Sequence, residues 1–211
     1  AQNVGRPIDT QKHDGMKLKH EMDVDAQVYV GDSDLGATGL LNNPEVEVAN
    51  VANGDWADLV NGADTTSKVA DKIVADVNNF LHRVWENTGW TMVPELLRLP
   101  PKQFSLLVAT KVSDAGNMSI LQYLQTNNLC YAQNGRQLDI QPIKWLQTGG
   151  EGSATRMFAY TKRKDLVRFP MVPMQNTPIE HRDLNQLTTY YCLLGEVEWV
   201  YPETGGYADG I

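Results

Sequence analysis

The sequence has few of the residue types that build metal sites and disulfide frameworks. It contains two cysteines, Cys130 and Cys192, and four histidines among 211 residues. Two sulfur atoms cannot form a thiolate zinc site, and they are too few for the disulfide framework of a small secreted protein. We therefore expect two reduced thiols with a packing role.

Long apolar runs and basic residues are also scarce. No run approaches the roughly 20 apolar residues of a membrane-spanning helix, and no signal peptide is visible, so we expect a cytosolic origin and no membrane partner. The chain carries 18 Lys and Arg against 26 Asp and Glu, a formal charge of −8. A general nucleic-acid binder needs a basic face, so this balance argues against that class.

The most distinctive segment that is present runs from Gly31 to Asn42. Three of its glycines fall within nine residues, and glycine adopts positive φ angles at little cost. The apolar pair Leu40-Leu41 then gives the turn something to bury. The segment therefore predicts a tight structural turn, called the glycine corner below, between two packed elements.

The same segment contains Asp32-Ser33-Asp34, which resembles the start of a calcium-binding loop. Such a loop requires glycine at its sixth position and glutamate at its twelfth, where this chain has Ala37 and Asn43. An Asx-rich turn therefore explains these aspartates better than an ion site does.

A long helix is predicted before the corner. It begins at a cap formed by Asp9 or Thr10 and runs to about Val30, and Gly31 is typical of the residue that follows a helix. Apolar residues spaced four, four and three apart form its predicted stripe: Leu18, Met22, Ala26 and Tyr29.

A clearer amphipathic helix is predicted over residues 66–87, followed by Gly89. Because Pro100-Pro101 cannot lie inside a helix, residues 104–109 are interpreted as a buried strand. A third helix is predicted from a cap at Asn117 to about Thr126.

Short strands dominate the second half of the chain, and a further one is expected near residues 46–51. The predicted strands comprise residues 138–140, 143–146, 156–160, 166–172, 187–194 and 196–201, with the last two paired around Gly195. Helices followed by many strands indicate an α+β fold and not alternating βαβ units.

No motif predicts catalytic, cofactor-binding or metal-binding residues, and no cofactor is expected. The glycine-rich segment 149–153 has no lysine to form a phosphate loop, so a hairpin turn is favoured. No serine lies in a Gly-x-Ser-x-Gly elbow, and no histidine pair has helical zinc spacing. His82 lies near the apolar stripe of the second helix and is interpreted as a structural histidine. The glycosylation sequon at Asn117 is better explained by helix capping.

One basic cluster stands out, formed by Lys162-Arg163-Lys164 with Arg168. Such a run can contact phosphate, but it is more often a solvated hairpin or a partner for acidic residues on a neighbouring subunit. In an acidic protein, a local basic patch suits a complementary protein interface.

Six segments, in their order along the chain, are more specific than any single motif: 31–42, 71–77, 90–94, 97–100, 158–169 and 195–202. Their order resembles the major capsid proteins of tailed phages with the Hong Kong 97-type coat fold, and in particular a phage-related coat family that is similar to encapsulin shells. Together they cover most of the chain, from about Ile8 to Ile211.

The resemblance implies two domains. A peripheral domain of residues 1–104 plus 176–211 should hold a spine helix, the second helix packed beside it, and the final strands. An axial domain of residues 105–175 should hold a small sheet with flanking helices. Family members carry an N-terminal arm and an extended loop ahead of the spine helix; here the chain begins almost at that helix, so we expect a trimmed or shortened form.

The function implied is that of a capsid subunit and not of an enzyme. It would self-assemble as hexamers and pentamers into the shell of a phage or prophage, in the host cytoplasm, and enclose DNA without sequence-specific binding. Scaffolding, portal and decoration proteins are its expected partners, and the virion is its expected location. An encapsulin-like shell protein is the nearest alternative, and a soluble enzyme or ligand-binding domain is a second.

Overall fold

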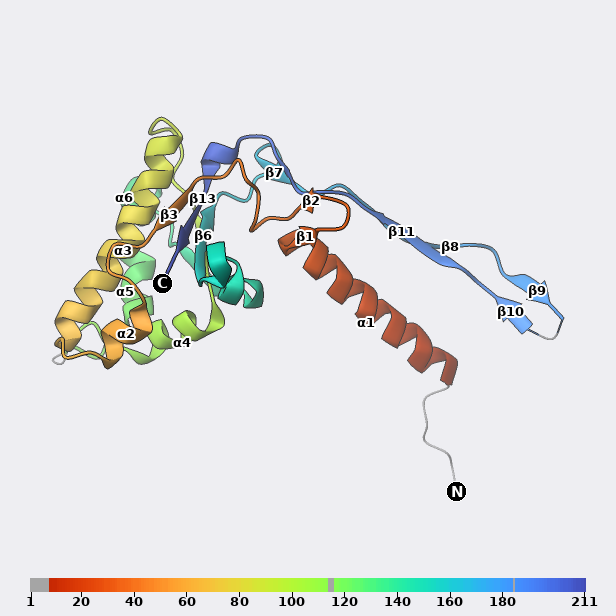
Figure 1. The fold of residues 1–211 in the computed structure, drawn as a ribbon, viewed down its shortest axis with the longest axis horizontal. Coiled ribbons are helices and arrows are strands. Elements are labelled where there is room, and N and C mark those ends of the chain that lie inside the picture. Colours follow the sequence, from red (N-terminus) through yellow and green to blue (C-terminus); the bar gives the residue numbers. More distant parts are fainter. Residues whose placement is uncertain (1–7, 114–115, 184) are drawn as a thin grey trace, which may run out of the picture. The chain divides into compact units, whose positions relative to one another are not determined.

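A computed structural model describes residues 8–113, 116–183 and 185–211 (Figure 1). Its α-helices are α1 (Ile8–Tyr29), α2 (Trp56–Asn61), α3 (Thr66–Asn87), α4 (Pro101–Ala109), α5 (Ile120–Thr126) and α6 (Leu129–Asn134), and short 3₁₀ helices are η1 (Lys144–Thr148), η2 (Glu151–Ser153) and η3 (Pro202–Thr204). Within those ranges, no helix is both long and apolar enough to cross a membrane.

The strands of the described residues are short. They are β1 (Gly31–Asp32), β2 (Ala37–Thr38), β3 (Val48–Asn50), β4 (Leu96–Leu99), β5 (Asp139–Pro142), β6 (Arg156–Tyr160), β7 (Val167–Arg168), β8 (Met171–Asn176), β9 (Glu180–Arg182), β10 (Asn185–Leu187), β11 (Tyr190–Leu194), β12 (Glu198–Trp199) and β13 (Gly205–Asp209). The predicted α+β content is therefore present.

The chain divides into two compact units. Unit 1 comprises residues 1–42 and 169–198, and unit 2 comprises residues 43–168 and 199–211. These limits differ from the predicted domain limits at residues 104/105 and 175/176. The two long helices, α1 and α3, belong to different units.

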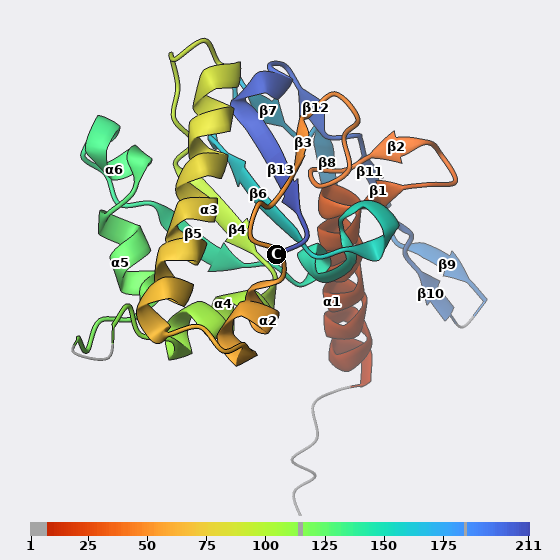
Figure 2. The ribbon, with the colours of Figure 1, turned by 60° about the vertical axis from the view of Figure 1, so that its left-hand side comes forward.

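Unit 2 is built on a five-stranded sheet in the order β3-β13-β6-β4-β5 (Figure 2). Strand β13 runs parallel to β3 and antiparallel to β6, and β4 runs antiparallel to β6 and parallel to β5. Every residue of β6 and β13 is buried. The core of unit 2 therefore lies around these two central strands and the helices that pack on them.

Helix α3 has the predicted limits because its apolar residues repeat at helical spacing. Val69, Ile73, Val77, Phe80 and Val84 are all buried in the unit 2 core. Gly89 follows the helix with φ of +62°, as a residue beyond a helix end commonly does.

Two predictions in the following segment are wrong. Residues 104–109 form part of helix α4, not a strand, because Pro101 occupies the first helical position. Proline is favoured there, since that amide would have no partner inside the helix. Helix α5 is capped by Ser119 and not by Asn117, and Ser119 and Gln122 form a capping box.

The strands of the second half are only partly as predicted. Residues 156–160 form β6 as expected, but residues 143–146 fall mostly in η1. Strand β11 pairs antiparallel with β8 and not with the segment after Gly195, and β8 includes Pro173. Proline is tolerated there because both strands of a two-stranded ribbon are edges. Helices α2 and α6 and strand β13 were not predicted.

Unit 1 contains α1, the β1–β2 hairpin, and a ribbon formed by β8 and β11 (Figure 1). Helix α1 spans Ile8–Tyr29, so both predicted caps, Asp9 and Thr10, lie inside it. His13, Met16, His20 and Val24 are half-buried along α1, whereas Leu18 and Met22 are 59% and 54% exposed. Of the predicted stripe, Ala26 and Tyr29 are half-buried, whereas Leu18 and Met22 point to solvent, so the stripe packs only at its C-terminal end.

Candidate functional site

The glycine corner is a structural turn. The Asp34 amide donates to Asp32 Oδ1 over 2.9 Å, which is the predicted Asx turn. Gly31 has φ of +78°, and a Cβ atom there would lie 2.2 Å from the Ala37 carbonyl oxygen. No group of three or more potential metal ligands occurs among residues 8–113, 116–183 and 185–211.

Side-chain hydrogen bonds hold the end of this corner against α1. Asn42 accepts from the Gly39 amide over 2.6 Å and donates to the Val30 carbonyl over 2.7 Å. Glu196 accepts from the amide and hydroxyl of Thr38 over 2.9 and 2.6 Å, and these bonds lower the pKa of the Glu196 carboxyl. The side chains of Asn42 and Glu196 therefore stabilise the turn by hydrogen bonds to its backbone.

The second glycine-rich segment faces an acidic side chain. Its residues 151–153 form η2, and the Glu151 amide donates to Asp209 Oδ2 over 3.0 Å. A Cβ atom at Gly150 would lie 2.9 Å from the Asp209 carboxylate carbon. A carboxylate in this position repels phosphate, so the segment does not form a phosphate loop. It is a turn that is hydrogen-bonded to β13 through Asp209. The turn is a 3₁₀ turn and not the predicted hairpin.

The histidines and cysteines form one contact that the sequence does not reveal. Cys192 Sγ on β11 lies 3.7 Å from His20 Nδ1 on α1. Cys130 is buried in unit 2, and burial, followed by the charge of Glu95, raises the pKa of its thiol. Both thiols are free, as predicted. His82 lies on the exposed side of α3 in an edge contact with Trp90, and not in the apolar stripe.

Three residues of the basic cluster, Lys162, Arg163 and Lys164, lie in the loop between β6 and β7, and the fourth, Arg168, lies in β7. Lys162, Arg163 and Lys164 are exposed, and Arg163 pairs with Asp165 over 2.6 Å. Neither lysine has a hydrogen-bond or ion-pair partner among the described residues. The loop therefore presents two uncompensated positive charges to solvent.

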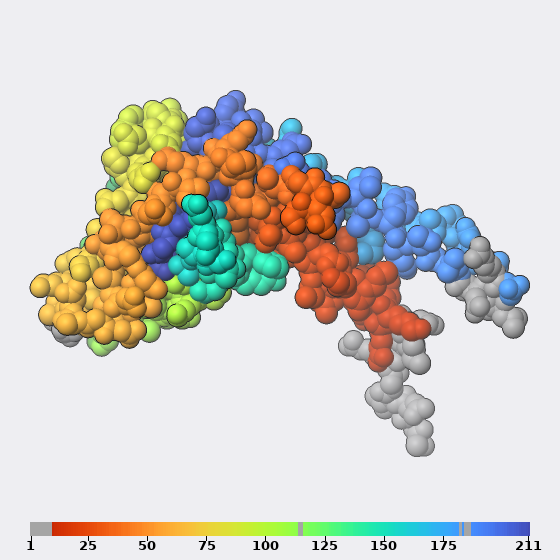
Figure 3. Space-filling view, in the orientation of Figure 1, coloured from red at the N-terminus to blue at the C-terminus, as the bar shows by residue number. Residues whose placement is uncertain are grey.

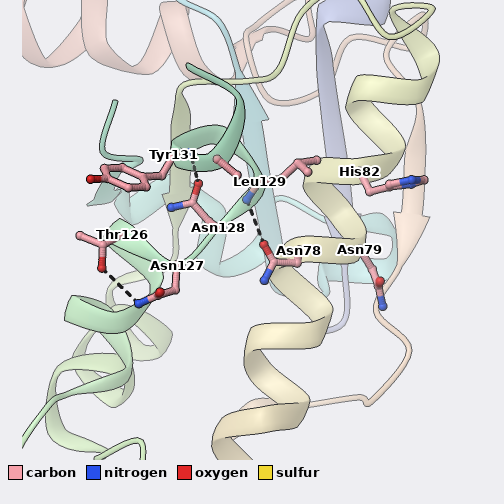
Figure 4. Close-up of a pocket in the computed structure, with 9 residues that line it drawn as sticks. Asn78, Asn79, His82, Thr126, Asn127, Asn128, Leu129 and Tyr131 are labelled. Atoms are coloured by element: carbon pink, nitrogen blue, oxygen red, sulfur yellow. Dashed lines mark hydrogen bonds between the residues drawn. The ribbon is translucent and has the colours of Figure 1, made fainter. Parts of the chain in front are cut away.

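A groove of about 520 Å³ lies in unit 2 between α3 and the α5–α6 segment (Figure 4). Its sides are mainly amide side chains: Asn78, Asn79, Asn127 and Asn128. Asn78 accepts from the Leu129 amide, and Asn128 caps α6 by accepting from the Tyr131 amide. His82 and Tyr131 are the two ionisable side chains among its nine lining residues, and Figure 4 shows them on opposite sides of the groove.

Unit 1 has a different candidate surface, formed by exposed apolar residues. On the ribbon these are Met171, Tyr190, Tyr191 and Leu193, and on α1 they are Leu18 and Met22. Figure 3 shows the surface of α1 in red and orange. These exposed apolar side chains make the ribbon and the outer side of α1 candidate interaction surfaces.

Comparison with known proteins identifies a family and a fold. A family model described as "Major capsid protein" matches residues 1–211. No curated protein matches the sequence. The capsid of Myoviridae phage XM1 is similar in structure, with a TM-score of 0.76 and 13% identity over 97% of this chain. The chain spans 65% of the length of that capsid chain.

An encapsulin shell is also similar. The holo-SrpI encapsulin complex from Synechococcus elongatus PCC 7942 has a TM-score of 0.54 and 14% identity, over 100% of this chain and 68% of the encapsulin chain. At these identities, the likeness shows the fold. The predicted capsid-type α+β fold is confirmed.

Proposed function

The chain belongs to the major capsid protein family, and we propose that it is a structural subunit of the icosahedral shell of a tailed phage or prophage. The observation that carries the proposal is the contrast between the two units. Unit 2 buries a continuous apolar core, whereas Leu40, Leu41 and Val197 are the buried apolar residues of unit 1 in its described part.

A unit with so small a core needs apolar contacts from outside. Isolated two-stranded ribbons are marginally stable in water, and the β8–β11 ribbon carries four large exposed apolar side chains. Contacts between copies would cover this surface and stabilise the ribbon. Self-assembly into a shell would therefore provide the apolar contacts that unit 1 lacks in a single chain.

We further propose a peripheral and an axial domain, as the resemblance implies. The compact units support an assignment of unit 1, with α1 as the spine helix, to the peripheral domain, and of unit 2 to the axial domain. This assignment moves the boundary from residues 104/105 to 42/43 and from 175/176 to 168/169, and it separates α3 from the spine helix.

The remaining parts of the proposal follow from the family. Copies would assemble as hexamers and pentamers in the host cytoplasm and enclose DNA, with scaffolding, portal or decoration proteins as partners. An acidic wall repels phosphate and would let packaged DNA move. We assign no catalytic role. The encapsulin likeness favours a second candidate, a shell that encloses a protein cargo.

Electron microscopy of the full-length gene product tests this function. Closed shells or rings of subunits are the expected result, and a monodisperse monomer at high concentration would contradict it. The contents of purified particles separate the two candidates, because a capsid encloses nucleic acid and an encapsulin-like shell encloses protein.

A further inference from the structure

The negative charge of the chain is concentrated in one unit. Unit 1 contains 5 Lys and Arg against 11 Asp and Glu, a formal charge of −6. Unit 2 contains 13 against 15, a formal charge of −2. The basic cluster, defined here as the basic loop Lys162–Lys164, lies in unit 2. Both units are net negative, so attraction between separate copies has to come from a local basic surface such as this loop.

The exposed face of α1 combines apolar and acidic side chains. Leu18 and Met22 are four positions apart and Glu21 is three positions from Leu18, so both Glu21 and Met22 neighbour Leu18 on the helix surface. Two other helices expose a large apolar side chain, Val108 on α4 and Tyr131 on α6. Neither has an acidic residue three or four positions away. Among the described helices, only α1 pairs exposed large apolar residues with a neighbouring carboxylate.

Lysine matches such a face in two ways. Its aliphatic stem covers apolar surface while its ammonium group stays at the edge, and the ammonium attracts the carboxylate. Lys162 and Lys164 are exposed and have no partner among the described residues, so both can take this position without breaking an ion pair.

We propose that the basic loop of one copy binds the outer face of α1, formed by Leu18, Glu21 and Met22, on a second copy. The inference rests on the proposed function, because it requires that copies assemble. The contact joins two different surfaces, so it is heterologous, and repetition of such contacts around an axis closes a ring. Because ion pairs at the edge of the contact are screened, added salt weakens it.

Charge reversal tests the contact. We expect the Lys162→Glu/Lys164→Glu variant to lower the assembly constant, measured by light scattering, by about tenfold or more, which corresponds to about 1.4 kcal/mol. Glu21→Lys alone should also lower assembly. Combined with the loop variant, Glu21→Lys should raise assembly above that of the loop variant alone, since the charges are again opposite. The proposal is overturned if the combined variant loses as much assembly as the sum of the two separate losses, or more.

The matched control is Lys68→Glu/Lys102→Glu, which changes the net charge by the same amount at two other exposed lysines of unit 2. It should leave assembly within about twofold of the parent. An equal loss in the control would attribute the effect to net charge and would overturn the proposal.

Disulfide trapping tests the geometry separately from shell formation. Lys162→Cys and Glu21→Cys are introduced together in a Cys192→Ser background, and the protein is oxidised mildly at high concentration. A ladder of covalent oligomers on a non-reducing gel supports the contact, and a monomer band overturns it whether or not it carries an intrachain link. Glu21→Cys with Lys68→Cys is the control. Shells of the parent chain without this ladder would leave the capsid function standing, whereas a ladder without shells or rings would count against the function alone.

Discussion

Arg156 and Asp209 face each other across β6 and β13 and form a buried bidentate ion pair. Arg156 Nε lies 2.6 Å from Asp209 Oδ1, and Arg156 Nη2 lies 2.8 Å from Oδ2. The two side chains are 7% and 5% exposed. The guanidinium also lies 4.5 Å from the ring centroid of Tyr207. A charge pair thus joins the two central strands and, through the Glu151 amide, the η2 turn.

Removing one partner of this pair should strongly destabilise unit 2. Asp209→Ala leaves the Arg156 guanidinium buried without its carboxylate, and we expect a loss of about 3–5 kcal/mol in the free energy of unfolding. Urea denaturation measures it. The exposed pair of Arg163 and Asp165 provides the control, because solvent screens it and Asp165→Ala should therefore cost far less than Asp209→Ala. Equal losses in the two variants would refute the role of burial.

Asp76 should make stability depend on pH in an unusual direction. The carboxylate accepts from Asn53 Nδ2 over 2.7 Å and Trp56 Nε1 over 3.2 Å, but burial raises its pKa above the ordinary value of 3.8. The folded state therefore binds this proton more tightly than the unfolded state. Its stabilising contribution is complete below pH 3.8 and is lost as the pH rises through the raised pKa.

Substitution isolates this effect. The free energy of unfolding of the parent chain, minus that of Asp76→Asn, should fall as pH rises from the acidic range to neutrality.

Glu47 gives the opposite case. Burial alone would raise the pKa of its carboxyl, but hydrogen bonds from Asn87 and Arg83 lower it. The corresponding difference for Glu47→Gln should therefore fall as the pH decreases. Slopes of the same sign would contradict this account.

The sequence predicts elements well where one physical signal acts alone. Helix α3 was predicted with the correct limits because its apolar residues are buried along a single face. Helix α4 was missed because proline breaks a helix interior but favours a first helical position, and pattern alone does not distinguish these sites. Strand β13, of sequence Gly-Gly-Tyr-Ala-Asp, has little strand propensity and depends on burial between β3 and β6.

The candidate surface could be predicted only in part. The helical spacing placed Leu18 and Met22 on one stripe with Ala26 and Tyr29, but it did not show that only the last two are half-buried. The ribbon instead contacts the side of α1 that carries His13 and His20, through Tyr190 and Cys192. Long-range pairing of this kind depends on residues more than 160 positions apart, and no local pattern encodes it.

Two glycines of the corner should respond differently to alanine. Gly31 and Gly36 have φ of +78° and +68°, so each alanine should cost about 1–2 kcal/mol from backbone strain. At Gly36 a Cβ atom meets nothing within 4 Å, but at Gly31 it collides with the backbone of Ala37 and Gly39. Gly31→Ala should therefore be the more destabilising variant in thermal unfolding. The reverse order would show that the close backbone approach is not a constraint.

The exposed stripe of α1 should matter to assembly and not to the fold of one chain. Leu18→Ala/Met22→Ala removes side chains that are more than half exposed, so the free energy of unfolding of the monomer should stay within about 0.5 kcal/mol of the parent. Shell or ring formation, measured by electron microscopy and light scattering, should fall because the apolar contact between copies is lost. Ile73→Ala, at a fully buried position of α3, supplies the contrast and should cost about 2–5 kcal/mol. If the α1 variant unfolded as easily as Ile73→Ala while its folded fraction still assembled normally, the stripe would be part of the core of unit 1 and not a contact between subunits.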